Sequence, residues 1–275
     1  MDQDSGLFDR LVDEAWPAPG RVTADGWIYR HAGGVTKRAN SVLPPADSVD
    51  SARADLAGAV ERAEKFYAGL GLRCVFSIGV PSIGVPSIGV PSIGVPSIGV
   101  PSIGPGAATG LDAELDSRGY RMVDPTLIMT APLPRDAVPD GEVAAEPSER
   151  WLRTWWRVDG GRHRDDEETP AMEWARRIMT GVPAGYAHQE GDTGAGVGRG
   201  VVQGQWLGVY CMAVEPRARR RGLGRSVLRT LFAWGRERGA ERAYLAVTEP
   251  NVGARALYER EGFTVAGRYH YRVAP

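Results

Sequence analysis

The residues best suited to chemistry form a loop rich in glycine and arginine in the C-terminal half of the 275-residue chain. An apolar stretch ends at Val214, Pro216 interrupts it, and the pattern Arg-x-x-Gly-x-Gly then opens a helical pattern. Glycines let the backbone approach a ligand, free N–H groups at a helix start attract anions, and arginines add charge-assisted hydrogen bonds. The loop therefore predicts a pyrophosphate site formed by Arg219, Arg220, Arg221, Gly222, Leu223, Gly224, Arg225 and Ser226.

Other anion-binding sites fit this segment poorly. A Walker A loop needs Gly-Lys followed by Ser or Thr, and the loop has no lysine. A dinucleotide fingerprint needs a third glycine where this chain has Val227. A nucleic-acid patch would explain the arginines, but the chain has 33 Lys and Arg against 34 Asp and Glu, whereas general polyanion binders are strongly basic. We therefore expect no nucleic-acid partner.

A second set of residues, Asn251-x-x-Ala254-x-x-Leu257-Tyr258-x-x-x-Gly262-Phe263, follows the loop in the sequence. Together with Val214-x-Pro216 and Arg219-x-x-Gly222-x-Gly224, it resembles the GNAT superfamily of N-acetyltransferases. The whole chain also resembles a two-domain actinobacterial subgroup of that family. The residues that carry this second likeness are GVTKRANSVLP at 34–44 and YHYR at 269–272.

The resemblance implies an α/β (α+β) GNAT acyl-CoA acyltransferase fold, with helices flanking a mixed, mostly antiparallel sheet. It implies acetyl-CoA as cosubstrate and direct attack of a primary amine within a ternary complex. A backbone N–H of the strand carrying Met212, Ala213 and Val214 would stabilise the carbonyl oxygen as it gains charge. Tyr258 matches a position where many relatives place the acid that protonates the leaving thiolate, and Asn251 matches a position that contacts the cofactor.

Several residues could act as the general base, because an ammonium group must lose a proton before it attacks. Some relatives use a glutamate on the strand before the asparagine, but Ala246 occupies that position here. We name Glu215 and Glu249 as candidate catalytic carboxylates. The other options are His188, Tyr210 or a chain of water molecules.

The elements that must position these residues follow from periodicity and turn signals. In the C-terminal half we expect helices at 149–158, 169–180, 222–238 and 252–261, and strands at 184–189, 198–203, 206–214, 244–248 and 263–273. In the N-terminal half we expect strands at 27–30, 35–43, 73–78 and 122–131, the last one or two strands around Pro125, and helices at 50–70 and 110–117. Trp151, Trp155 and Trp156 share a helix and are interpreted as core or as the wall of a substrate pocket.

The two halves end alike, with a strand, a loop, a helix, Arg-Gly-Tyr or Glu-Gly-Phe, and a final strand. This indicates an internal duplication into two tandem GNAT-like halves. Residues 1–135 would be a degenerate domain, because no Arg-x-x-Gly-x-Gly follows Pro44. Residues 136–148 would be a linker and 149–275 the catalytic domain. The SIGVP repeat at 77–105 is interpreted as a turn-rich loop inserted into the first half.

The sequence leaves two further questions open about how the halves combine. The stretch around Arg38, Asn40 and Ser41 could help form the acceptor pocket or could pack the halves together. The edge of the C-terminal sheet could be completed by the N-terminal half or by a second subunit.

Composition limits the remaining functions. The two cysteines lie far apart without CxxC spacing, so neither a disulfide framework nor a metal site is expected, and Cys211 should pack. An acidic N-terminus without an apolar region, and the lack of a spanning apolar run, predict a cytoplasmic protein without membrane partners. The acceptor is expected to be a small-molecule amine, with a peptide amine next, and the protein a monomer or homodimer. The alternative is an inactive acetyl-CoA-binding sensor or scaffold.

Overall fold

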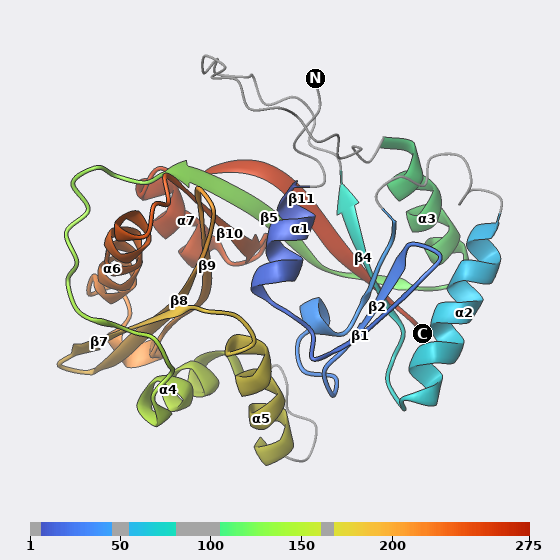
Figure 1. Cartoon of the computed structure of the whole chain (residues 1–275), viewed down its shortest axis with the longest axis horizontal. Coiled ribbons are helices and arrows are strands. Elements are labelled where there is room, and N and C mark those ends of the chain that lie inside the picture. Colours follow the sequence, from blue (N-terminus) through green and yellow to red (C-terminus); the bar gives the residue numbers. More distant parts are fainter. Residues whose placement is uncertain (1–6, 46–54, 81–104, 161–167) are drawn as a thin grey trace.

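The computed structural model describes residues 7–45, 55–80, 105–160 and 168–275 (Figure 1). The N-terminal half contains α1 (Leu7–Ala15), β1 (Gly20–Ala24), β2 (Trp27–His31), the short 3-10 helix η1 (Lys37–Ala39), β3 (Val42–Leu43), α2 (Leu56–Gly69), β4 (Val75–Val80), α3 (Pro105–Ser117) and β5 (Arg121–Pro132). The C-terminal half contains β6 (Val143–Ala144), α4 (Glu149–Asp159), α5 (Glu168–Met179), β7 (Gly185–Gly191), β8 (Gly194–Gln203), β9 (Trp206–Val214), the 3-10 helix η4 (Pro216–Ala218), α6 (Leu223–Glu237), β10 (Arg242–Thr248), α7 (Val252–Arg260) and β11 (Thr264–Val273).

Within the described residues, eleven strands form one sheet in the order β1-β2-β3-β4-β11-β5-β10-β9-β8-β7-β6. The order is nearly symmetric about its centre, because β1 to β4 in one half correspond to β7 to β10 in the other. Each half contains one parallel pair, β3 with β4 and β9 with β10. The tandem GNAT-like fold expected from the resemblance is therefore present.

The final strands of the two halves are exchanged. Strand β5 pairs with β10 from Thr126 opposite Thr248 to Pro132 opposite Arg242, and β11 pairs with both β4 and β5. In Figure 1, β5 and β11 are the long strands that cross the middle of the molecule. The N-terminal half therefore completes the edge of the C-terminal sheet, which decides between the two options left open above.

Most predicted elements are present, with small shifts at their ends. The expected strand at 35–43 is wrong: the chain forms η1 there, and only Val42–Leu43 is a strand. The cause is local, because Thr36 has a positive φ of 58° and the Asn40 side chain bonds four backbone groups of the turn. Asparagine side chains compete with strand hydrogen bonding in this way.

The SIGVP repeat begins inside a strand, which corrects its interpretation as a loop from residue 77. Ser77 pairs with Tyr271 and Ile78 with His270, both on β11. The rest of the repeat, residues 81–104, lies outside the described residues, as do residues 50–54 at the start of the helix predicted at 50–70. Around Pro125, the chain forms one strand, and the ladder with β11 has an irregularity nearby, between Tyr269 and Tyr271.

The segment expected to be a linker, 136–148, packs on the C-terminal half. Its strand β6 pairs with β7 and forms the edge of the sheet. The N–H of Asp140 donates to Thr230 Oγ1 at 3.1 Å, and Ser226 Oγ donates to Asp140 Oδ2 at 2.6 Å. This segment is therefore fastened to helix α6 along its path.

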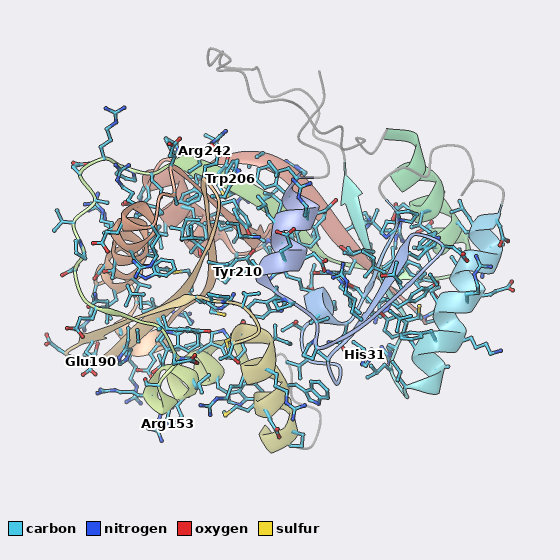
Figure 2. The ribbon with its side chains drawn as sticks, viewed as in Figure 1. His31, Arg153, Glu190, Trp206, Tyr210 and Arg242 are labelled. Carbon is cyan, nitrogen blue, oxygen red and sulfur yellow. The ribbon has the colours of Figure 1, made fainter. Side chains whose placement is uncertain are left out.

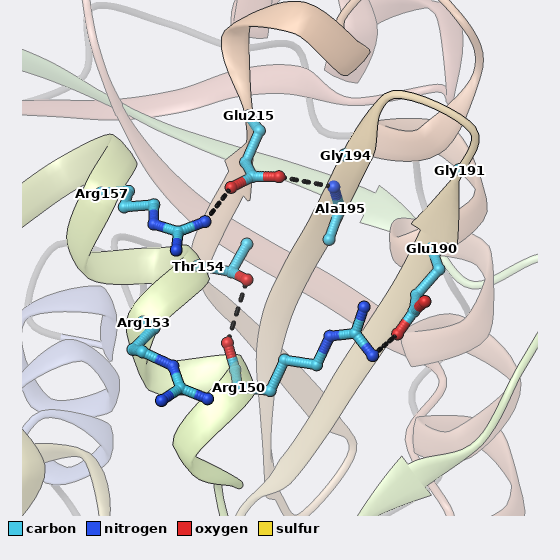
Figure 3. Close-up of a pocket in the computed structure, with 9 residues that line it drawn as sticks. All are labelled: Arg150, Arg153, Thr154, Arg157, Glu190, Gly191, Gly194, Ala195 and Glu215. Atoms are coloured by element: carbon cyan, nitrogen blue, oxygen red, sulfur yellow. Dashed lines mark hydrogen bonds and ion pairs between the residues drawn. The ribbon is translucent and has the colours of Figure 1, made fainter.

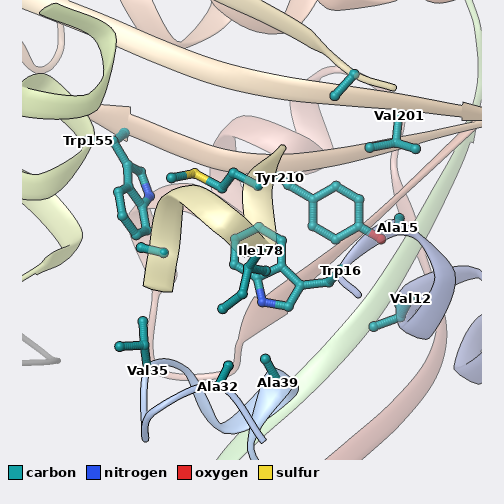
Figure 4. Packing of buried hydrophobic residues seen from close by; sticks show 14 of the residues in the cluster. Val12, Ala15, Trp16, Ala32, Val35, Ala39, Trp155, Ile178, Val201 and Tyr210 are labelled. Carbon is teal, nitrogen blue, oxygen red and sulfur yellow. The ribbon is translucent and has the colours of Figure 1, made fainter. Parts of the chain in front are cut away.

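Among the described residues, three apolar clusters form the core. One lies under α2 and α3 in the N-terminal half, and a second lies under α6 and α7 in the C-terminal half. The third is shared by both halves on the other face of the sheet, beneath α1, α4 and α5 (Figure 4). Trp151, Trp155 and Trp156 are all buried in it, so they belong to the core. None of the described helices is long and apolar enough to cross a membrane.

Candidate active site

The central feature is a gap where two parallel strands part. Strands β9 and β10 pair from Trp206 opposite Arg242 to Val209 opposite Leu245, and the pairing then stops. Figure 2 labels Trp206, Arg242 and, just past the last pair, Tyr210. Cys211 has a positive φ of 53°, and the β8–β9 register shifts between Val197 and Arg199. This bulge bends β9 away from β10.

Residues beside the gap are half-buried although they lie in the middle of a covered sheet. Met212, Val214, Ala246 and Thr248 all have this intermediate exposure. Backbone groups of β9 that would otherwise bond β10 are available there, since the ladder has ended. Met212, Ala213 and Val214, whose strand the resemblance implied would contact the reacting acetyl group, lie on β9 beside this gap.

The predicted anion loop connects β9 to α6. After η4 the chain passes through two left-handed residues, Arg220 with φ 62° and Gly222 with φ 86°. Gly222 caps α6 without a side chain, and the first backbone bond of the helix runs from Ser226 N–H to Gly222 O at 3.0 Å. The N–H groups of Leu223, Gly224 and Arg225 thus point out of the helix start without intrahelical partners. This geometry suits a phosphate group.

The loop's side chains divide into two groups. Arg219, Arg220 and Arg221 are all exposed, and Arg219 Nε donates to Val214 O at 3.0 Å. Arg225 is paired with the buried carboxylate of Glu261 at 2.6 Å, and the Ser226 hydroxyl donates to the linker segment as described above. The side chains of Arg225 and Ser226 therefore stabilise the start of α6 as the structure stands, a role that the sequence did not reveal.

Gly224 is needed for a close approach between elements. A Cβ atom on Gly224 would lie 3.2 Å from Leu257 Cδ2 and 3.6 Å from Val214 Cγ2. The start of α6 therefore packs directly against α7 and β9. The second glycine of the motif has a packing role in addition to exposing its backbone.

Helix α7 carries the other two predicted residues. Asn251 caps the helix, its Oδ1 accepting from the Ala254 N–H at 3.2 Å. Tyr258 is buried, with its ring 5.8 Å from that of Phe263 in the cluster beneath α6 and α7. Burial raises the pKa of Tyr258, so the phenol stays protonated and can act only as a proton donor near neutral pH.

The two candidate carboxylates are both engaged in ion pairs. Glu215 accepts the Ala195 N–H at 2.9 Å and pairs with Arg157 at 2.9 Å. The bond from Ala195 and then that from Arg157 hold the pKa of Glu215 below its ordinary value, which makes the carboxylate a weak base. Glu249 pairs with Arg268 of β11 at 2.9 Å.

The other candidate bases are also poorly suited. His188 lies on β7, two strands away from β9, and burial lowers its pKa. Burial raises the pKa of Tyr210 to about 12, and its hydroxyl is 2.7 Å from that of Tyr244. Among the described residues, no cluster of three His, Cys, Asp or Glu side chains could hold a metal ion.

A polar pocket of about 670 Å³ opens between α4 and the β7–β8 turn (Figure 3). Three arginines on one face of α4 line it, and two of them are ion-paired, Arg150 with Glu190 and Arg157 with Glu215. Glu215 thus ties the start of the anion loop to α4. The pocket lies beside that loop.

A cluster lies next to the gap on the opposite face from α6. The sequence named two of its residues, Arg38 and Tyr210, separately and did not predict that they come together. Residues alternate between faces along a strand, and Tyr210 belongs to the shared cluster whereas Val209 belongs to the one beneath α6. The Trp16 ring stacks on that of Tyr210 at 5.8 Å. Arg38 and Arg199 each lie within 6 Å of both rings, at 5.6 to 5.8 Å. These residues come from four separate elements, so no spacing in the sequence could signal the cluster.

Two features characterise the site. Strand β9 is bulged and parts from its parallel neighbour β10, and free backbone N–H groups at the start of α6 lie beside the gap. Together they define a GNAT-type N-acetyltransferase. The family model described as "Probable histone acetyltransferase Rv0428c C-terminal" matches residues 116–272, and the chain belongs to this family. The matched range includes β5, the strand that the N-terminal half supplies to the C-terminal sheet.

Individual relatives agree with this assignment. The chain is 27% identical over 279 residues to the "Uncharacterized N-acetyltransferase YobR" of Bacillus subtilis, covering 98% of each chain. It is 30% identical over 184 residues to a mycothiol acetyltransferase of Salinispora tropica, covering 57% of this chain and 56% of that protein. The solved GCN5-related N-acetyltransferase of Kribbella flavida has a similar fold, with a TM-score of 0.63, 15% identity and coverage of 100% and 96%.

Proposed function

We propose that the protein binds acetyl-CoA in its C-terminal half and transfers the acetyl group to a primary amine of a small molecule. The observation that carries the proposal is the gap between β9 and β10 directly beside a helix start with three unbonded N–H groups. Acetyl-CoA is a long, thin thioester that carries a pyrophosphate. The gap would hold its chain, and the helix start would bind the pyrophosphate.

Each part of the cofactor has residues that suit it. The N–H groups of Leu223, Gly224 and Arg225 would bind the pyrophosphate, with Arg220 and Arg221 adding charge. Gly222 has no atom within 4 Å of a Cβ position, so a ligand can approach its backbone. Met212, Ala213 and Val214 would bind the pantetheine by their backbone, and Asn251 would contact it from α7. Acetyl-CoA supplies the activated acetyl group.

The chain's own residues would then assist the transfer. A backbone N–H at the β9 bulge would stabilise the oxygen that gains charge when the amine adds. Tyr258 would donate the proton that the departing thiolate needs. Glu215 and Glu249 are ion-paired, so we propose that the amine's proton leaves through water in the gap and that neither carboxylate acts as base.

The small-molecule acceptor is supported by the Salinispora relative, which is named for mycothiol and not for a protein. A protein N-terminus or lysine is the next option for this chain. The N-terminal half has no counterpart of the arginine and glycine loop after β3, and we propose that it binds no cofactor.

Calorimetric titration of the purified chain with acetyl-CoA tests the proposal, together with an assay of thiol release in the presence of amines. We expect one site per chain and amine-dependent release. Two sites would contradict a degenerate N-terminal half. Binding without transfer to any amine would favour a sensor or scaffold, and a folded protein that binds no acetyl-CoA would refute the proposal.

A further inference from the structure

Arg38 of the N-terminal half reaches into the C-terminal half beside the gap. Its guanidinium lies 5.6 Å from the centre of the Trp16 ring and 5.8 Å from that of Tyr210. Its Nη2 donates to the Tyr269 hydroxyl at 3.1 Å, and its Nε is buried without a hydrogen-bond partner. Arg38 as a whole is half-buried, so part of the residue is exposed to solvent.

The charge of Arg38 is not balanced as those of the fully buried arginines are. Arg30 pairs with Asp13 at 2.9 Å, and Arg272 pairs with Asp112 at 2.7 Å. Arg199 donates to Met179 O at 3.0 Å and to Ala15 O at 2.9 Å, the last residues of α5 and α1. Helix C-termini carry partial negative charge. Within the described part of the chain, Arg38 has neither a carboxylate nor a helix end against it.

The backbone next to Arg38 is held in a strained conformation. Thr36 has a positive φ, which a β-branched residue adopts only under strain. The side chain of Asn40 offsets this strain: its Oδ1 accepts from Ala32 and Gly34, and its Nδ2 donates to Val35 O and Thr36 O. Strain held by such bonds occurs where a residue must be positioned for function.

The position of Arg38 relative to the gap indicates which substrate it could bind. Tyr210, which Arg38 contacts, directly precedes the bulge at Cys211, whereas Tyr258 lies in the cluster on the other face. A cofactor held from the α6 and α7 face leaves the face of Tyr210 for the acceptor. The Trp16 and Tyr210 rings lie on the same side of the guanidinium, because their centres are only 5.8 Å apart. The planar N–H groups of a guanidinium match the oxygens of a carboxylate or phosphate.

We infer that the acceptor carries an anionic group, a carboxylate or a phosphate ester, which binds Arg38 while its amine lies at the gap between β9 and β10. The inference rests on the proposed acetyl transfer and narrows its substrate to small amines with a negative charge. It also gives the N-terminal half a part in the site: it supplies a specificity-determining residue and no cofactor-binding loop.

The test compares matched pairs of amines at saturating acetyl-CoA. The probes are the common amino acids against their amides, and O-phosphoethanolamine against ethanolamine. We measure kcat/KM from thiol release. A charge-assisted contact predicts at least a roughly 10-fold preference for the anionic member of one pair, and the pair that responds separates a carboxylate from a phosphate.

Variants then assign the preference to one side chain. Arg38→Met should reduce it to within about 3-fold while acetyl-CoA affinity stays unchanged, and Arg38→Lys should give an intermediate value because the charge remains but the fork is lost. The matched control is Lys37→Met on the same short helix, whose ammonium pairs with Asp124 at 2.9 Å. It should keep the wild-type preference.

The outcomes separate the two proposals. Equal turnover of anionic and neutral amines by the wild-type protein overturns the inference on Arg38 and leaves acetyl transfer standing, as does a preference that survives in Arg38→Met. A protein that binds acetyl-CoA but acetylates no amine of the panel overturns both. The wild-type comparison does not depend on whether any variant folds.

Discussion

His270 Nε2 lies 2.8 Å from Asp112 Oδ1, which joins the exchanged strand β11 to helix α3 of the other half. The same aspartate receives two bonds from Arg272, and Asp116 receives another at 2.6 Å. The strand exchange is thus fixed by charged groups as well as by backbone ladders. The ion pairs between α3 and β11 should therefore contribute to the free energy of unfolding of the whole chain.

Replacing Asp112 by Asn should destabilise the protein by about 2 kcal/mol at pH 7, because Arg272 loses its main carboxylate. The bonds from Arg272 and then His270 hold the pKa of Asp112 below its unfolded value of 3.8. A depressed pKa stabilises the fold above the unfolded value, and the contribution is lost as the pH falls through the folded pKa. The effect on urea unfolding should therefore shrink below about pH 4. Asp116→Asn is the control, because its side chain is 69% exposed; an equal loss there would contradict the assignment.

Replacing Gly224 by Asp should reduce acetyl-CoA affinity by at least about 100-fold, since a carboxylate would face the pyrophosphate and the Cβ would crowd Leu257. Calorimetry measures the affinity. Gly253→Ala in α7 is the matched control, because nothing lies within 4 Å of its Cβ position. Retained affinity in Gly224→Asp would refute the loop as the cofactor site.

Replacing Tyr258 by Phe should lower kcat by about 100-fold or more and leave acetyl-CoA affinity within about 2-fold, because only a general acid is lost. The ring stays in its apolar cluster, so the melting temperature should not fall. The raised pKa of Tyr258 also predicts that it adds no alkaline limb to the pH profile of kcat below about pH 10. Unchanged kcat would leave Tyr258 as a packing residue.

Deleting Ser82–Pro101 should leave the melting temperature unchanged or raise it slightly. The connection between β4 and α3 would shorten from 24 residues to four, and loop closure costs only about 0.6 kcal/mol for each doubling of length. Differential scanning calorimetry gives the comparison. A fall of more than about 5 °C would mean that the repeat makes stabilising contacts.

Local patterns in the sequence predicted most of the fold and the loop. The strand at 206–214 and the helix from 222 follow from periodicity and turn residues that act over a few positions. The pairing of β5 with β10 did not follow, because both halves offer equivalent strands and the sequence does not say which partner each takes.

The sequence predicted those parts of the site that lie within one continuous segment and missed those that depend on contacts between distant segments. The left-handed Thr36 and the side chain of Asn40 interrupt the stretch at 35–43 that was expected to be a strand. The ion pairs of Arg225, Glu215 and Glu249 depend on residues up to 58 positions away. Contacts of this kind arise from tertiary packing and leave no spacing to recognise.

The exchange of β5 and β11 has a consequence for synthesis of the chain. Strand β4 leaves the ribosome early, but its neighbour on one side is β11, which ends at Val273. Throughout translation of the C-terminal half, β4 therefore exposes an unpaired edge. Such an edge is open to wrong partners. The N-terminal half cannot complete its sheet until the last strand has been translated.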